Sequence, residues 1–290
     1  MKSICIKTNN KTVIDYLLEN FENLNMKETY ISIKDFKHFS NIIIHYKDIN
    51  TTTFINSISN ILTKATILFY EDNLITASIY LNYFYFNKLE IKSIIENTQK
   101  LLKEYDVINT KYDLINNSIF KHLLNHHSLY FKSFIDFRLK EYKDLIDKKV
   151  DLAVNQFLID KEYIEFVNIL RLYINSESSS SNLEHLHLIY KNKDSIIIDD
   201  NKNIVSCNDN ITKAKYISDI TFSSNDYALN TLLTLLPKKI YIHLLDNYVD
   251  EFVHTLGLIF DGRVEICTDC DICKLYKSKD LKLSHNIIKK

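Results

Sequence analysis

Glycine, proline and tryptophan are almost absent from this chain, which has two, one and none of them among its 290 residues. With Gly257 and Gly262 as its only glycines, it cannot build a glycine-rich loop around a phosphate group. This excludes the Walker-type nucleotide site and the dinucleotide fingerprint, and with them most kinase, ATPase and NAD-dependent dehydrogenase mechanisms. No nucleophile elbow, cysteine–histidine catalytic signature or paired-carboxylate pattern is evident either. The sequence therefore favours a protein that is not an enzyme.

A large net charge of either sign is also lacking, because 36 Lys and Arg residues nearly balance 37 Asp and Glu residues. No global field draws in nucleic acid or an anionic membrane. The longest uncharged stretch, 73–87, is too short and too polar to span a membrane, and the N-terminus does not have the pattern of a signal peptide. We therefore expect a cytoplasmic protein without a membrane span, in which thiols stay reduced.

Hydrophobic patterning predicts an α+β protein. Residues 1–50 are expected to form a small α/β unit in the order strand, helix, strand, strand, and residues 51–176 a helical region. Within that region, apolar residues from Ile135 to Phe157 recur every three or four positions, as in an amphipathic helix, and Asp160 can cap a second helix after it. A Ser-rich linker at 175–182 is the clearest domain boundary.

The period changes to two after the linker, which predicts a C-terminal α/β module over residues 183–273. It begins with a β-meander, continues with a helix that ends before Pro237, and closes with a β-α-β unit. If the two strands of that unit are parallel, their carboxyl ends lie on one edge of the sheet, where ligands of α/β proteins tend to bind. Cys267 ends the second strand, so the loop after it lies at this edge. Residues 274–290 form a basic tail.

Four blocks of the sequence resemble the YtxC family of endospore-forming bacteria. The resemblance covers about residues 130–273, while the first 120 residues match only loosely. It implies a sporulation-associated protein in a cytosolic bacterial context, and because the family has no assigned biochemical activity it supplies no catalytic residues. The blocks are FIDFRLKEY, VDLAVNQFLIDKEYIEFVNIL, LLPKKIYIH and DGRVEICTDCDIC.

Three of the five cysteines, Cys267, Cys270 and Cys273, follow each other in steps of three. The spacing C-x-x-C-x-x-C can place three thiolates around one metal ion or an iron–sulfur cluster. A ferredoxin-type run would need a fourth cysteine where Lys277 stands, so that match fails. Zinc or an iron–sulfur cluster is the cofactor that the pattern favours; plain reduced cysteines, and redox exchange or a disulfide, are the alternatives.

A structural zinc site needs a fourth ligand. Cys207 at the end of the meander and His285 in the tail are the two candidates from the chain, and a partner molecule is a third source. Asp269 and Asp271 lie between the thiols and are expected to raise the thiol pKa values by like-charge repulsion. This argues against a redox thiolate, and a divalent cation would relieve the repulsion.

Other charged and histidine positions favour structural roles. Arg138 and Glu141 are three apart on a helical edge, and we expect a half-buried ion pair rather than a recognition site. His122 and His126, with His127 adjacent, have a helical metal-ligand spacing but lack the glutamate of a zinc-protease motif, since Leu123 stands there.

The remaining histidines lie in the C-terminal module. His185 and His187 alternate on one strand face, where we expect solvent or a domain contact, and His243 and His254 are each isolated in sequence and are expected to be structural.

The tail carries six lysines against one aspartate, which is the pattern of a solvated tail but could also contact nucleic acid beside the cysteine loop. Three functions stay open: a non-enzymatic sporulation factor with a metal-binding loop and an unknown protein partner, a nucleic-acid-binding module that uses the loop and tail, or a cysteine-dependent redox or iron–sulfur enzyme. The charged residues of the tail are Lys274, Lys277, Lys279, Lys282, Lys289, Lys290 and Asp280.

Overall fold

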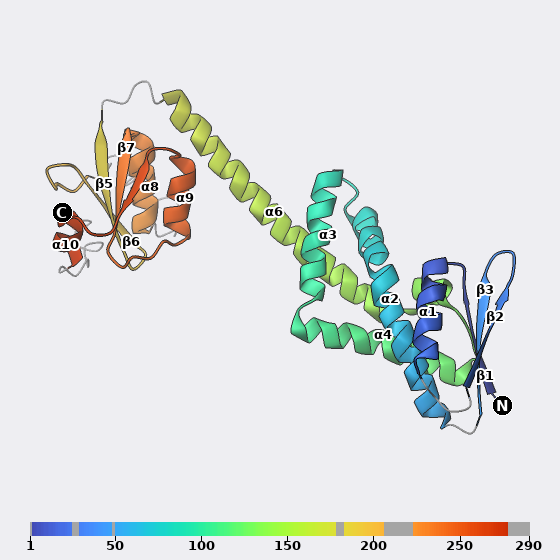
Figure 1. Ribbon diagram of the computed structural model, residues 1–290. Helices are drawn as coiled ribbons and strands as arrows, with labels where there is room; N and C mark the ends of the chain where they lie inside the picture. Colours follow the sequence, from blue (N-terminus) through green and yellow to red (C-terminus); the bar gives the residue numbers. More distant parts are fainter. Residues whose placement is uncertain (1, 25–28, 48–49, 178–182, 206–222, 278–290) are drawn as a thin grey trace, which may run out of the picture. The chain divides into compact units, whose positions relative to one another are not determined.

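The computed structural model describes residues 2–24, 29–47, 50–177, 183–205 and 223–277. Its contacts divide the chain into two units, Met1–Ile159 (unit 1) and Asp160–Lys290 (unit 2). Each unit contains one four-stranded sheet with helices, so the predicted α+β class is confirmed (Figure 1). No helix within the described ranges is long and apolar enough to cross a membrane.

The sheet of unit 1 has the strand order β2-β3-β1-β4. β3 lies antiparallel to both β1 and β2, and a short fourth strand that the sequence pattern did not predict pairs with β1 in parallel. Alternation along β1 and β3 places Ile4, Ile6, Ile42 and Ile44 in the core. The strands are β1 (Lys2–Thr8), β2 (Thr29–Asp35), β3 (Ser40–Tyr46) and β4 (Ser128–Tyr130).

Helices cover one face of this sheet and continue into a helical region. Asparagines begin three of the helices: the side chains of Asn10, Asn50 and Asn87 accept hydrogen bonds from backbone N–H groups of the first turn. One hydrophobic core joins the sheet to the helices up to Val154. The helices are α1 (Lys11–Glu22), α2 (Thr51–Asn82), α3 (Lys88–Leu102), α4 (Tyr105–Asn125), α5 (Phe131–Arg138) and α6 (Lys140–Glu177).

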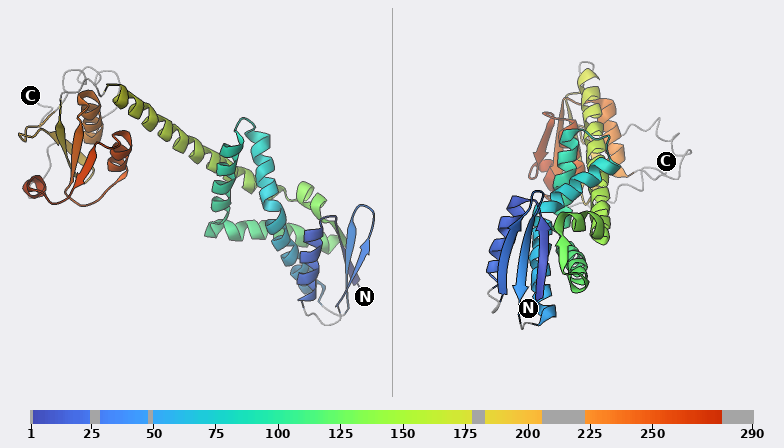
Figure 2. Two further views of the ribbon diagram at one scale, coloured as in Figure 1. Left: turned by 45° about the horizontal axis from the view of Figure 1, so that its top comes forward. Right: turned by 90° about the vertical axis from the view of Figure 1, so that its right-hand side faces the viewer.

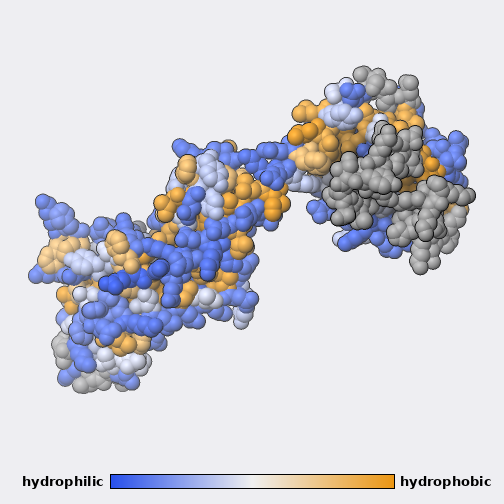
Figure 3. Space-filling model, turned by 180° about the vertical axis from the view of Figure 1, so that it is seen from behind, coloured by the Kyte–Doolittle hydropathy of each residue, from blue (hydrophilic) through white to orange (hydrophobic). Residues whose placement is uncertain are grey.

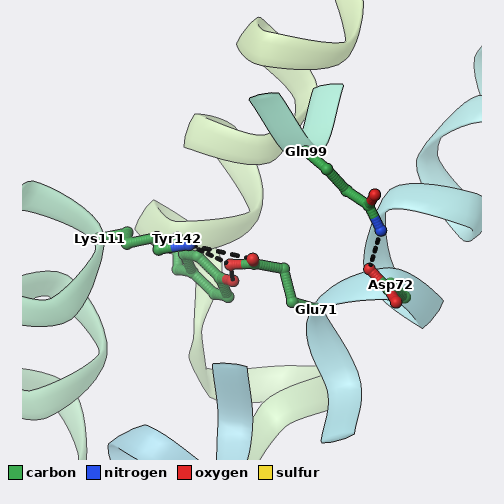
Figure 4. Close-up of polar contacts among 5 residues, drawn as sticks. All are labelled: Glu71, Asp72, Gln99, Lys111 and Tyr142. Carbon is green, nitrogen blue, oxygen red and sulfur yellow. Dashed lines mark hydrogen bonds and ion pairs between the residues drawn. The ribbon is translucent and has the colours of Figure 1, made fainter. Parts of the chain in front are cut away.

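A buried polar cluster ties three of these helices together (Figure 4). The Glu71 carboxylate of α2 accepts hydrogen bonds from Lys111 Nζ of α4, at 2.9 and 3.0 Å, and from the Tyr142 hydroxyl of α6, at 2.6 Å. Burial, followed by the charge of Glu71, raises the pKa of Tyr142, which therefore remains a hydrogen-bond donor. At the edge of the cluster, the side-chain amide of Gln99 donates to Asp72 at 2.7 Å.

Two expectations about the middle of the chain are wrong. The helix predicted from Ile135 onward is interrupted at Leu139, whose φ of −90° and ψ of 51° separate α5 from α6. By contrast, Asp160 caps no second helix, because α6 continues through it to Glu177. The apolar periodicity runs on across Asp160, and no glycine or proline stands nearby to end the helix.

Apolar side chains are also found on the surface, where orange areas interrupt a mainly hydrophilic surface in Figure 3. In the part of α6 that belongs to unit 2, one side packs into the core through Val167 and Ile174, while Ile169 and Leu172 are 64% and 70% exposed.

The sheet of unit 2 has the order β6-β5-β7-β8. β5 and β6 form a hairpin whose two turn residues, Asn192 and Lys193, both have positive φ, as a type I′ turn requires. β5, β7 and β8 are mutually parallel, which confirms the predicted parallel β-α-β unit. The expected third meander strand is reduced to one bridge between Ile198 and Ile204. The strands are β5 (His185–Lys191), β6 (Asp194–Ile198), β7 (Lys239–Leu244) and β8 (Val264–Cys267).

The two faces of this sheet are covered differently. The larger core packs α8 (Ser224–Leu235), α9 (Glu251–Ile259) and the end of α6 on the face that carries Leu188 and Ile242. The opposite face carries a smaller cluster in which α10 (Asp271–Lys277) contributes the buried Cys273. The turn before β8 uses Gly262 at a φ of 77°, as the sequence predicts for a left-handed position. This turn starts β8 at the amino end of the sheet, and β8 then runs to the carboxyl end, where the cysteines lie.

Candidate metal centre

Three separate segments of unit 2 bring four side chains together. His243 lies at the end of β7 and Cys267 at the end of β8, and the two residues are direct partners in the parallel register. Cys270 precedes α10, and Cys273 lies in its first turn. Since parallel strands end at one edge of a sheet, His243 and Cys267 meet there, and the turn after β8 brings the other two cysteines to them.

The distances between the four side chains suit one tetrahedral ion. Cys273 Sγ lies 3.8 Å from Cys267 Sγ and 3.7 Å from Cys270 Sγ, while His243 Nδ1 lies 3.3 and 3.4 Å from Cys270 Sγ and Cys273 Sγ. Zinc–sulfur and zinc–nitrogen bonds of about 2.3 and 2.0 Å in a tetrahedron place sulfurs about 3.8 Å apart and nitrogen about 3.5 Å from sulfur. Four of the six pairs of donor atoms therefore already have about the spacing of zinc ligands, and all four atoms lie within 4.8 Å of one another.

Helix α10 positions two of the thiols. The backbone N–H of Cys273 donates to Cys270 Sγ at 3.4 Å, and the N–H of Lys274 donates to the Cys270 carbonyl at 2.9 Å. Cys270 therefore occupies the capping position at the start of the helix, and a spacing of three residues turns Cys273 to the same side. Lys277 Nζ donates to the Thr268 carbonyl at 3.1 Å, which closes the loop back on the helix.

The thiols differ in acidity. Burial acts to raise the pKa of Cys270, but hydrogen bonds from the Cys273 N–H, from the neighbouring thiols and from the Ile272 N–H outweigh it and lower the pKa. Burial raises the pKa of Cys273 to about 11. The expectation that Asp269 and Asp271 raise the thiol pKa values is thus wrong at Cys270, because backbone donors at the start of α10 stabilise its thiolate.

His243 is buried and connected to a second histidine. Its Nε2 lies 3.0 Å from His187 Nδ1, and His187 Nε2 lies 3.1 Å from an Asp200 carboxylate oxygen. Burial, followed by the nearby His187, lowers the pKa of His243 to about 4. Near neutral pH the imidazole is therefore uncharged, and Nδ1, the atom that faces the sulfurs, can act as a ligand.

The structure brings together Cys267, Cys270 and Cys273 as the sequence spacing suggests. The two candidates for the fourth ligand, Cys207 and His285, lie outside the described residues. His243, expected to be isolated and structural, is the residue that completes the group of four. The signal was its place at the end of β7: had the register of the two parallel strands been known, it would have placed His243 beside Cys267.

The remaining histidine candidates are not part of the cluster. His187 is not solvated as expected, since it is held between His243 and Asp200, and His185 packs beside Tyr241 with ring centroids 5.8 Å apart. The rings of His122 and His126 lie 4.7 Å apart, and His122 Nε2 contacts the Ser128 carbonyl at 3.2 Å. Among the residues that the structure describes, the four-membered cluster is the one group that could hold a metal ion.

The expectation of a half-buried ion pair between Arg138 and Glu141 is wrong. Both residues are exposed, and they lie on different helices, because the chain breaks at Leu139 between α5 and α6. Of the basic tail, residues 278–290 lie outside the described part of the chain.

Comparison with known proteins connects the chain to one family. The family model described as the YtxC-like family matches residues 56–265, which is more than half of the chain and begins earlier than the resemblance seen in the sequence blocks. The match ends two residues before Cys267. Neither the curated proteins nor the solved structures contain a match.

Proposed function

Since the chain belongs to the YtxC-like family, we propose that it is a cytosolic, sporulation-associated protein whose C-terminal module is held together by one zinc ion. His243, Cys267, Cys270 and Cys273 are the ligands in this proposal. The mutual spacing of the four donor atoms is the observation that supports it. The sporulation role rests on the family alone.

A single ion fits the site better than an iron–sulfur cluster. A [4Fe–4S] cluster binds each thiolate to a different iron, and a [2Fe–2S] cluster divides its four ligands between two irons, so bridging sulfide holds ligands on different irons far apart. Here the sulfurs of Cys267 and Cys270 each lie within 3.8 Å of Cys273 Sγ. A Cys₃His set also matches the ligands that structural zinc takes. We therefore propose zinc rather than an iron–sulfur cluster for this group.

A structural role follows from the number of ligands. Catalytic zinc keeps an open position for water or substrate, whereas four protein ligands close the coordination shell. The ion joins the end of β7, the end of β8 and α10, and so secures a strand of four residues at the sheet edge. We accordingly propose a non-enzymatic role for this centre, with its chemistry limited to holding the module in shape.

Anaerobic purification followed by elemental analysis tests the assignment. We expect one zinc and no iron per chain, and tetrahedral cobalt absorption after cobalt replaces zinc. Cys273→Ser should abolish binding, while Cys5→Ser, which changes the other free cysteine of the described residues, should leave it unchanged. Iron with visible charge-transfer bands would refute the zinc assignment. A metal-free protein whose cluster thiols all react freely would refute the site itself.

A further inference from the structure

The sheet of unit 1 presents one face that none of the described helices of that unit covers. In Figure 1 the helices of unit 1 lie to one side of β1–β3, and in the right-hand view of Figure 2 the strands face the viewer with the helices behind and beside them. The strand registers show which side chains share this outward face. They are Ser3, Cys5, Lys7, Tyr30, Ser32, Lys34, Asn41, Ile43, His45, Ser128 and Tyr130.

Contacts between strands confirm this side of the sheet. The His45 ring lies between two serine hydroxyls, 2.8 Å from Ser3 Oγ and 3.4 Å from Ser32 Oγ. Lys7 Nζ lies 4.6 Å from the centre of the Tyr130 ring. Side chains from all four strands therefore meet on one surface.

A run of aromatic rings crosses the end of the outward face, where the turn after β2 adds two phenylalanines. The Phe36 and Phe39 rings are stacked with centroids 5.2 Å apart, and Phe39 meets Tyr130 edge-on at 5.6 Å. Phe36 and Tyr130 are 45% and 49% exposed, although rings of this size are usually turned inward when a core is available. Phe36 and Tyr130 therefore keep exposed ring surface that a ligand can contact, although a lysine lies over one face of each ring.

Lysines alternate with these rings. Lys34 Nζ lies 5.4 Å above the Phe36 ring, and Lys7 Nζ lies 5.9 Å from the Phe39 ring besides its contact with Tyr130. Lys37, in the turn between Phe36 and Phe39, is exposed. None of the eleven outward positions named above is Asp or Glu. The face is thus locally basic in a chain whose total charge nearly cancels.

We propose that this outward face binds single-stranded nucleic acid. Bases stack on the rings of Phe36, Phe39 and Tyr130, while Lys7, Lys34 and Lys37 contact the phosphates. Exposed aromatic rings on the face of a sheet accept bases of any sequence, because every base has a π face. The interleaved lysines supply the opposite charge along the path of the backbone.

Other occupants fit these observations less well. A second copy of the chain would bring its own lysines against the same lysines, which costs free energy without a compensating carboxylate on the outward face. An acidic peptide would satisfy the lysines but has no need for exposed stacking surface. Duplex nucleic acid keeps its bases stacked on each other, so it cannot use the rings. The combination of charge and open rings therefore favours an unpaired strand.

Fluorescence anisotropy with labelled 12-nucleotide single-stranded RNA and DNA tests the proposal on the full-length protein at several salt concentrations. The ring variant combines Phe36→Leu with Tyr130→Leu, and should raise the Kd about 30-fold or more while leaving the salt dependence intact, because each ring contributes about fivefold or more. The charge variant combines Lys7→Gln with Lys34→Gln, and should lower the slope of log Kd against log salt by about 1.4, because each phosphate contact on a single strand contributes about 0.7.

Matched controls change the same residue types elsewhere in unit 1. Phe84→Leu alters a ring that is 78% exposed, and Lys92→Gln an exposed lysine of α3; both should bind as the unchanged protein does. Circular dichroism of every variant shows whether the fold is retained. Stronger binding of RNA than DNA, or the reverse, identifies the sugar that the face prefers, and either result supports the proposal.

Several results would overturn it. Absence of binding at low salt is one, and affinity that neither pair of substitutions changes is another, since it would assign binding to a different surface. Equal binding of heparin with no effect of the ring variant would reduce the face to a general polyanion surface. A concentration-dependent dimer that the ring variant dissociates would instead identify a second copy as the occupant. Loss of zinc from unit 2 should leave nucleic-acid binding unchanged, which separates this test from that of the metal centre.

Discussion

Nε2 of His243 lies 3.0 Å from Nδ1 of His187, on the side of the ring that faces away from the cysteine sulfurs. Asp200 lies 3.1 Å from the far nitrogen of His187. A carboxylate that accepts from His187 Nε2 leaves His187 Nδ1 as an acceptor for the N–H of His243. The chain of contacts thus fixes the tautomer in which His243 Nδ1 carries the free lone pair.

Removal of this support should weaken metal binding without abolishing it. We expect His187→Phe or Asp200→Asn to lower zinc affinity about 10- to 100-fold at unchanged stoichiometry, as loss of an outer hydrogen-bond partner does. Competition with a chromophoric chelator measures the affinity. His185→Gln, on the same sheet face but without contact to His243, is the control. Unchanged affinity in both variants would show that the ring orientation is determined by packing alone.

The metal-free protein should lose stability in mild acid through His243. Because its folded-state pKa of about 4 lies below the ordinary value of 6.5, the unfolded chain takes up the proton first as pH falls. The stability contributed by the neutral ring is complete above pH 6.5 and is lost as pH falls towards 4, by about 2–3 kcal/mol.

Urea-dependent pulse proteolysis of chelator-treated protein, followed on peptides of unit 2, measures this loss between pH 7 and pH 5. A His243→Asn variant lacks the titrating ring and should show a shallower dependence on pH. Equal dependence in both proteins would assign the acid sensitivity to other groups.

Replacement of only one residue of the buried pair Glu71 and Lys111 should lower the stability of the protein strongly. Lys111→Met leaves the Glu71 carboxylate buried with only the Tyr142 hydroxyl as a partner, and we expect a loss of about 3–5 kcal/mol. Addition of Glu71→Gln removes the orphaned charge and should restore part of the stability. Hydrogen exchange of α2 and α4 peptides measures the stability of the single variant and of the double variant.

Lys149→Met is the matched control for that pair. Lys149 contacts Glu104 at 3.1 Å, but the Glu104 side chain is 53% exposed, so the expected loss is at most about 1 kcal/mol. A similar cost for both substitutions would contradict the role assigned to burial.

The two glycines should respond to alanine in opposite directions. Gly262 has a φ of 77°, so Gly262→Ala should cost about 1 kcal/mol through backbone strain, even though no atom lies within 4 Å of the added methyl group. Gly257 lies inside α9 with equally open space, and Gly257→Ala should stabilise the helix by about 0.8 kcal/mol. The protease resistance of unit 2 measures the change in stability that each of the two substitutions causes. Similar effects would show that backbone conformation does not decide the outcome.

Local patterns were enough to predict most elements of unit 2. They were not enough to predict which residues lie opposite each other on neighbouring strands. The alternation in 239–244 and the turn at Gly262 indicate a β-α-β unit, which places the cysteine loop at a sheet edge. His243 could be assigned to the same edge, but only the register with Cys267 brings the two side chains together. Register between parallel strands depends on packing across the whole sheet, which one sequence does not reveal.

The errors in the helical region have a similar origin. β4 has three residues, too few for alternation to be visible, and it forms because β1 offers it an open edge. Asp160 is a good capping residue, but the apolar faces before and after it are continuous, and packing overrides the capping preference. Ser223 and Asp226 form a capping box where the sequence predicts a helix start near Ser224, and there local preference and packing agree.

The pairing of β1 with β4 places Cys5 beside Ser128, although most of the sequence of unit 1 lies between these two residues. The chain between β1 and β4 contains α2, α3 and α4, so this pairing closes a much longer loop than the pairing of β1 with β3. Such a long loop closes slowly, and until it does β1 exposes unpaired backbone groups that can recruit another chain. Tyr130 belongs to β4, so the aromatic run on the outward face is complete only in molecules in which β4 has paired with β1.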